Sequence, residues 1–323
     1  PNHLHLQHIR AGLEAGIRVF SEKPVVSSLA QTWELAELLK KHGSDRLMVG
    51  LVLRYSQHMI DLTRAIDANQ LGEIISMEAN EHIGTYHGAF FMRDWRRYRR
   101  YSGGYMLEKC CHDLDLYTMI AGARPEKVTS FGGRRAFVPK NTPLANEPVE
   151  QYFEKPSLWN SAEDAFSSDG DIVDHQSALI QYSNGVTLAF HTNINSPEKQ
   201  RRFCVFGSHG MAEGEFQKGY LKVQSSRTGK VLVDVDYQQM PDAHLHHYGA
   251  DARMANRLTA FLRDETGQLP VSACDAMEAG IVAFAIDEAM QTGRIVDLNA
   301  LWTKFDAFEL MTGPQVRQAT LNA

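Results

Sequence analysis

The chain has 323 residues with 43% hydrophobic content, enough to bury two packed cores, which excludes a disordered protein. Its formal net charge of −6 gives no general attraction for nucleic-acid phosphates or anionic lipid. We see no run of 18 uncharged apolar residues and no signal-peptide pattern, so the sequence predicts a cytoplasmic protein without a nucleic-acid or membrane partner.

The first predicted elements alternate between helix and strand. Helical spacing covers residues 3–16, the apolar run 17–20 predicts a strand, a second amphipathic helix covers 28–46, and "LMVGLVLRY" predicts a second strand. This alternation is typical of βαβ units and a parallel sheet. Residues 1–53 therefore read as the second half of a doubly wound α/β domain whose first half is missing.

The pattern changes beyond Arg54. One more helix over 58–72 is followed by short alternating strands, and Ser183-Asn184-Gly185 is the clearest hairpin turn among them. Two helical segments, 250–265 and 272–293, follow late in the chain. Residues 54–323 are therefore expected to form an α+β domain with a large, mostly antiparallel open sheet flanked by helices. The exposed sheet face predicts a homodimer or homotetramer.

Charged residues stand at the mouth of the first predicted strand. Glu22, Lys23 and Pro24 follow it directly, at the carboxyl edge where open parallel sheets bind ligands. Pro24 restricts the backbone that carries Lys23, whose amine could hydrogen-bond a substrate hydroxyl. The simpler alternative is an exposed lysine that caps a strand end, and composition alone favours it.

A second motif, "SGGYMLEKCCHDLDLYTMIAG", predicts a helix preceded by two glycines. Glu108, His112 and Asp115 are spaced i, i+4 and i+7, so they share one helical face. Histidine titrates near neutrality, and His112 could take a proton from an alcohol while a hydride leaves the same carbon. The alternatives are a satisfied core histidine and, for Lys109 and Asp113, an i, i+4 salt bridge on a solvated face.

The segments "PNHLHLQHIRAGLEAGIRVFSEKP", "RYSQHMIDLTRAIDANQLGEI" and "GGYMLEKCCHDLDLYTMIAG" resemble, in order and spacing, the Gfo/Idh/MocA oxidoreductases, the glucose-fructose oxidoreductase and inositol dehydrogenase superfamily. The resemblance covers nearly the whole chain. It implies a Rossmann domain, then an α/β domain, and NAD(P)-dependent hydride transfer to or from a sugar, polyol or sugar derivative. NAD and NADP stay open, because the family's glycine-rich turn and ribose-reading strand are missing from the sequence.

The resemblance also assigns residues. Lys23 matches the family's catalytic lysine and His112 its catalytic histidine, while Glu108 stands where many members have an aspartate. The expected cofactor contacts are Asn2, His5, Glu22, Lys23, Pro24 and Arg54. The expected substrate contacts are Trp95, Lys109, Asp115, Asp174, His175 and His247.

Two other segments suggest different functions. "RDWRRYRR", residues 93–100, could indicate a nucleic-acid site, but the acidic chain and the position before the catalytic helix favour a loop over the substrate; a solvated, salt-bridged segment is equally open. His244, His246 and His247 could indicate a metal-dependent hydrolase, although their spacing matches no common zinc pattern, so no metal is predicted. A sugar-binding or regulatory homologue without turnover is a further alternative.

Overall fold

The computed structural model describes residues 1–147, 159–241, 246–263 and 271–310. The N-terminal part alternates helix and strand, as predicted. Its elements are α1 (His5–Glu14), β1 (Val19–Ser21), α2 (Leu29–His42) and β2 (Leu47–Val49). Strands β1 and β2 pair in parallel, with Val19 opposite Leu47. The second predicted strand is shorter than expected, because the chain turns after Val49 into a 3₁₀ helix, Val52–Tyr55.

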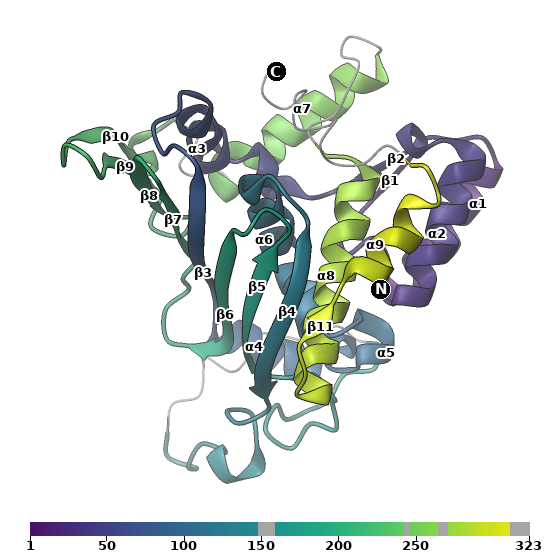
Figure 1. Ribbon diagram of the computed structural model, residues 1–323. Coiled ribbons are helices and arrows are strands. Elements are labelled where there is room, and N and C mark those ends of the chain that lie inside the picture. Colours follow the sequence, from purple (N-terminus) through teal and green to yellow (C-terminus); the bar gives the residue numbers. More distant parts are fainter. Residues whose placement is uncertain (148–158, 242–245, 264–270, 311–323) are drawn as a thin grey trace.

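A nine-stranded sheet dominates the rest of the described chain, in the order β10-β9-β8-β7-β3-β6-β5-β4-β11 (Figure 1). Its strands are β3 (Ile74–Gly84), β4 (Pro125–Gly133), β5 (His175–Tyr182), β6 (Thr187–Ser196), β7 (Arg202–Gly207), β8 (Gly210–Glu215), β9 (Tyr220–Ser225), β10 (Val231–Asp236) and β11 (Val296–Asp297). Neighbours are antiparallel except for β3 and β6, which are parallel. The predicted mostly antiparallel sheet is confirmed, and so is its β5–β6 hairpin, where Gly185 adopts a φ of 88°.

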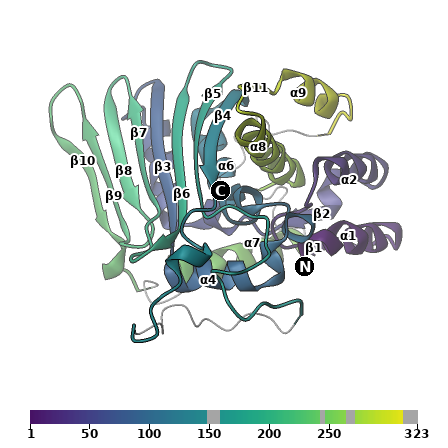
Figure 2. The same ribbon diagram turned by 90° about the horizontal axis from the view of Figure 1, so that it is seen from below.

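Helices cover one face of this sheet (Figure 2). Those with the main contacts to the strands are α3 (Gln57–Asp67), α4 (Thr85–Arg93), α6 (Tyr105–Ala121) and α8 (Ala273–Thr292). The other helices of this part are α5 (Arg99–Ser102), α7 (Ala250–Leu262) and α9 (Asn299–Asp306). Helices α6 and α8 pack against each other, and α8 also contacts β4, α2 and β2. This long helix therefore joins the small parallel pair of strands to the large sheet. The strands alternate inward and outward side chains, so the inner face of β5 and β6 is apolar while the outer face stays exposed.

A buried histidine on α3 makes stability depend on pH. The His58 ring centroid lies 4.7 Å from that of Phe216 and 4.1 Å from that of Tyr237, and burial lowers the pKa of His58 to about 3. Because the unfolded chain takes up this proton near pH 6.5, the free energy of unfolding falls below that pH, by at most about 1.4 kcal/mol per pH unit for this group.

We predict that His58→Phe, which keeps an aromatic ring in the cluster, weakens this dependence. Urea titrations at pH 7 and pH 5 should show a smaller loss of unfolding free energy in the variant than in the wild type. An identical loss in both proteins would show that His58 does not titrate on unfolding.

Candidate active site

Two glycines allow α6 to start against the loop that follows β1. Gly103 and Gly104 have φ of 86° and 103°, a region that side chains disfavour. A Cβ on Gly103 would lie 2.9 Å from the carbonyl oxygen of Ser27, and one on Gly104 would lie 2.7 Å from a carboxylate oxygen of Asp287. The close approach brings the first turn of α6, which carries Glu108, next to Lys23.

Lys23 and Glu108 form the centre of the site. The Lys23 ammonium donates to the backbone carbonyl oxygen of Glu108 at 2.6 Å and lies 3.9 Å from its carboxylate. The Glu108 carboxylate also accepts from the amide of Asn2 and, at 3.1 Å, from Nε of Arg96. Only 20% of the Lys23 side chain and 7% of the Glu108 side chain are exposed, so solvent screens this group weakly.

The residues expected on the cofactor side gather at the ends of β1 and β2. Nδ1 of His5 lies 2.8 Å from the carbonyl oxygen of Pro24, and the peptide bond from Lys23 to Pro24 is cis. Burial lowers the pKa of His5, while the nearby charge of Glu22 acts in the opposite direction. This edge is where an open parallel sheet presents its ligand site.

His112 lies one turn after Glu108 on α6 and is buried. Among the described residues, its Nδ1 has no hydrogen-bond partner, which does not fit a core histidine with satisfied hydrogen bonds. Burial lowers the pKa of His112 well below its ordinary value, and the positive charges of Lys23, Arg201 and Lys109 lower it further. The ring is therefore neutral at pH 7 and can accept a proton.

A buried ionic network supports α6 from the sheet. The ammonium of Lys109 lies 3.1 Å from the Glu81 carboxylate, and Arg201 Nε lies 3.0 Å from the other oxygen of Glu81. Arg201 also donates two hydrogen bonds, 2.9 and 2.8 Å long, to Asp113. The predicted salt bridge between Lys109 and Asp113 is therefore wrong, because a sheet arginine and a sheet carboxylate supply their partners.

Arg54 and Asp115 form a second buried network. Arg54 Nε donates to Asp115 at 2.8 Å, and Arg54 Nη2 lies 3.0 Å from Asp275 at the start of α8. The side chains of Arg54 and Asp115 are 4% and 2% exposed. Their charges compensate each other inside the protein. The contacts of Arg54 with cofactor and of Asp115 with substrate stay predictions.

The basic segment 93–100 folds against the site. Trp95 is buried, with its ring centroid 6.2 Å from that of Trp159. The guanidinium of Arg96 lies 4.2 Å from the Trp95 ring centroid and pairs with Asp94 at 2.7 Å, besides its bond to Glu108. The segment is salt-bridged, as one alternative predicted, but Trp95 is buried and Arg96 is largely covered, so this part of it is not a solvated face.

Asp174 and His175 contact each other at the start of β5, where Nδ1 of His175 lies 2.9 Å from the Asp174 carboxylate. The Asp174 carboxylate accepts three backbone N–H groups of the loop after β4, and the donors are Arg135, Ala136 and Phe137. His175 begins β5 on the outer face of the sheet, since Gln176 next to it points inward and donates to Asp287. The alternation places His175 on the face opposite α6, and the Asp174 carboxylate is occupied by backbone N–H groups, so neither position supports the expected substrate contact.

His247 is the described member of the predicted histidine group near α6. Its Nδ1 lies 2.8 Å from the Asp251 carboxylate, and its charge contributes to the lowered pKa of His112. His244 and the side chain of His246 lie outside the described residues. Within the described ranges, no three His, Cys, Asp or Glu side chains are arranged to hold a metal ion.

Sequence reasoning missed His87, the third residue of α4. Burial lowers the pKa of His87 to about 3, and the next causes are the charges of Lys109, Lys199, Lys23 and Arg96. Lys23 and Lys199 are far from His87 in the sequence. No local spacing pattern could have predicted that they converge.

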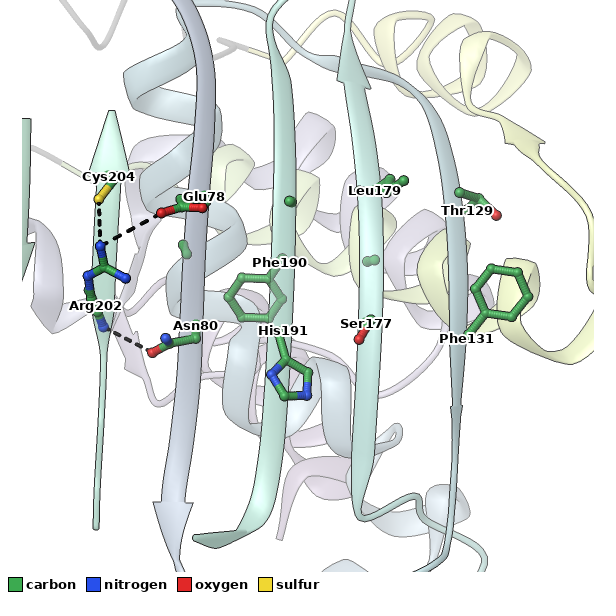
Figure 3. Close-up of a pocket in the computed structure, with 13 residues that line it drawn as sticks. Glu78, Asn80, Thr129, Phe131, Ser177, Leu179, Phe190, His191, Arg202 and Cys204 are labelled. Atoms are coloured by element: carbon green, nitrogen blue, oxygen red, sulfur yellow. Dashed lines mark hydrogen bonds and ion pairs between the residues drawn. The ribbon is translucent and has the colours of Figure 1, made fainter. Parts of the chain in front are cut away.

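A cavity of about 440 Å³ lies on the outer face of the sheet, the side opposite α6 (Figure 3). Its wall includes Phe131 and Leu179, which are 74% and 60% exposed, together with His191. Arg202 reaches from β7 toward Glu78, at 3.8 Å. The cavity contains neither Lys23 nor His112 and is not the candidate active site.

Comparison with known proteins gives a consistent result. The family model described as "Oxidoreductase family, C-terminal alpha/beta domain" matches residues 63–298, and "Oxidoreductase family, NAD-binding Rossmann fold" matches residues 1–51. A Bacillus subtilis protein named YteT is 25% identical over 65% of this chain and 57% of its own length. The scyllo-inositol 2-dehydrogenase (NAD(+)) of the same species is 27% identical over 74% of this chain and 60% of its own length. The chain thus spans less than two thirds of either relative.

The architecture also matches a solved structure. A levoglucosan dehydrogenase in complex with NADH and levoglucosan superposes with a TM-score of 0.74 at 17% identity, over 93% of this chain and 78% of that one. Among the described residues, none of the helices has the length and apolar character that crossing a membrane requires. The shared fold combines a small parallel sheet with a large, mostly antiparallel one.

Proposed function

Since this chain belongs to the Gfo/Idh/MocA oxidoreductase family, we propose that it transfers a hydride between a nicotinamide cofactor and a secondary alcohol or ketone of a sugar, polyol or sugar derivative. The observation that carries the proposal is that Lys23, at the carboxyl edge of a parallel strand pair, donates to the backbone carbonyl of Glu108, one helical turn before the buried imidazole of His112. An amine donor and an imidazole base are the two groups that oxidation of an alcohol needs at the reacting oxygen.

The described residues fit the nicotinamide end of such a cofactor. The ends of β1 and β2 present polar groups of His5 and Lys23 at one edge, where this class of sheet binds ligands. When bound, the oxidised cofactor accepts the hydride and the reduced one returns it. Contacts with the ribose of the cofactor determine the preference between NAD and NADP, so both stay candidates.

The side chains would divide the work at the substrate oxygen. Lys23 donates a hydrogen bond to it and stabilises negative charge as the proton leaves, because the ammonium is largely buried. His112 accepts the proton, and its buried position keeps the ring neutral beforehand. Glu108 would position Lys23, which contacts its carbonyl oxygen and lies near its carboxylate, and Asn2 would position Glu108 by donating to that carboxylate.

We also propose that the outer face of the sheet associates with a second copy of the chain. The support is its exposed apolar surface around the cavity, including Phe131 and Leu179. Static light scattering on the purified protein tests the idea, and the mass of a single chain at micromolar concentration would contradict it.

The test of the main proposal is a spectrophotometric panel. The full-length protein is incubated with NAD or NADP and a set of sugars, inositols and anhydrosugars, and absorbance is followed at the reduced-nicotinamide band. Turnover with at least one compound supports hydride transfer. Saturable binding of cofactor and sugar without turnover would instead support a sugar-binding homologue.

A further inference from the structure

Both oxygens of the Glu108 carboxylate are occupied by donors other than Lys23. One oxygen accepts from Nε of Arg96 at 3.1 Å, and the other accepts from the amide of Asn2. The ammonium of Lys23 lies 3.9 Å from the oxygen that Arg96 binds, which exceeds the length of a direct charge-assisted hydrogen bond, about 2.7–2.9 Å. The carboxylate therefore attracts the ammonium but does not hold it by a hydrogen bond.

The Lys23 ammonium keeps unused donors. Within the described part of the chain, its one hydrogen bond goes to the backbone carbonyl oxygen of Glu108, at 2.6 Å. An ammonium has three N–H donors, so the others stay available for a substrate oxygen. A direct bond to the Glu108 carboxylate would use one of them and would turn the ammonium toward the acid.

The guanidinium of Arg96 is fixed by a second acid and by two aromatic rings. Its Nη1 pairs at 2.7 Å with Asp94, which is buried. Its Cζ lies 4.2 Å from the ring centroid of Trp95 and 5.5 Å from that of Phe90. A planar guanidinium can bond two acids in fixed directions, which a single ammonium on a flexible stem does not do. The contacts therefore set the direction of the Nε–H that Glu108 accepts.

We propose that Arg96 is a positioning residue, which keeps the Lys23 ammonium available to the substrate by occupying the oxygen of the Glu108 carboxylate that lies nearest to it. The inference rests on the proposed function, because it concerns the donor at the reacting oxygen. Without Arg96, the vacated oxygen would take the Lys23 ammonium as its new donor, since a buried carboxylate is costly to leave unpaired. The ammonium would then be withdrawn from the substrate.

The first readout needs no substrate. The full-length protein and its Arg96→Ala variant are treated with formaldehyde and cyanoborohydride, which methylate neutral amines, and the labelling rate of Lys23 is followed by peptide mass spectrometry. Arg96→Ala should label Lys23 about threefold more slowly or less, because a carboxylate that pairs with an ammonium disfavours the neutral amine. Faster labelling, as in a loosened site, or an unchanged rate would overturn the proposal.

Arg124 provides a matched control, because it has the same kind of surroundings beyond the C-terminal end of α6. Its guanidinium pairs at 2.7 Å with one carboxylate from α8 and one from α9, and lies 5.1 Å from the ring centroid of Trp302. Arg124→Ala should lose as many ion pairs as Arg96→Ala but should leave the labelling of Lys23 unchanged. Equal slowing in both variants would show that a general loss of stability, rather than the vacated carboxylate oxygen, is responsible.

Kinetics with a substrate from the spectrophotometric panel give the second readout. Arg96→Ala should lower kcat by up to about 10²-fold, the cost of misplacing a group at the reacting centre, while KM for the cofactor changes little. Arg96→Lys keeps the charge but cannot bond both acids as a fork does, so it should recover only part of the loss.

The outcomes separate this inference from the proposed function. Slower labelling of Lys23 in Arg96→Ala, without turnover in any form of the protein, would support the positioning role and count against hydride transfer. Turnover that Arg96→Ala keeps at the wild-type rate would overturn the positioning role and leave the dehydrogenase standing.

Discussion

Replacing His112 by asparagine should lower kcat for hydride transfer by a factor of about 10²–10⁴, the usual contribution of a general acid or base. The amide keeps a polar side chain on α6 but cannot take the proton from the substrate oxygen. Cofactor affinity, measured by fluorescence titration, should change little. His209→Asn, in the turn between β7 and β8, serves as the matched control and should keep its activity.

The pH profile gives the same prediction a second readout. Burial and neighbouring cations hold the pKa of His112 well below its ordinary value, and only the neutral ring accepts a proton. Alcohol oxidation should therefore not lose its base between pH 8 and about 6.5, and the loss due to His112 should appear only at lower pH. Wild-type kcat in His112→Asn would exclude a role as base.

The second large effect is on stability. Arg54→Met leaves Asp115 buried without its arginine, which should cost about 3–5 kcal/mol of unfolding free energy. The melting temperature should fall by roughly 6–20 °C, at about 2–4 °C per kcal/mol. Differential scanning calorimetry measures the shift. Arg64→Met is the control, because its pair with Asp61 is on the surface and is worth about 1 kcal/mol or less.

A double variant distinguishes charge burial from lost packing. Replacing Arg54 by methionine and Asp115 by leucine together removes both charges, and Asp275 keeps the hydrogen bonds from Ser272. The pair should therefore recover part of the stability that the single variant loses. A double variant that is less stable than Arg54→Met would show that packing, rather than an unpaired charge, dominates.

The spacing of apolar residues in the sequence predicted the helices and the type of strand pairing in the N-terminal part. Helical spacing correctly predicted the extents of α6 and α8, and the parallel character of β1 and β2 followed from alternation of helix and strand. The shared face of Glu108 and His112 was also readable, since residues four apart on a helix lie together.

Residue spacing along the sequence could not predict ion-pair partners that are distant in the chain. Lys109 and Asp113 have the spacing of a salt bridge, yet Lys109 pairs with Glu81 on β3 and Asp113 pairs with Arg201, the residue before β7. No sequence pattern indicated His87, because some of the charged residues that affect its pKa lie near it only in the folded chain. The roles of Lys23, His112 and Glu108 as catalytic groups stay predictions until the variants are measured.

The parallel pairing of β3 with β6 has a consequence for how the protein is made. Strand β3 (Ile74–Gly84) is flanked by β6 and β7, which end at Ser196 and Gly207. At about 5–20 residues per second, the ribosome needs on the order of ten seconds to produce these partners after β3 emerges. During that time neither edge of β3 has its partner strand, although the side chains of one face are already ones that the complete sheet buries. The ion pair of Glu81 on β3 with Arg201, the residue before β7, therefore forms only after this later part of the chain has been made.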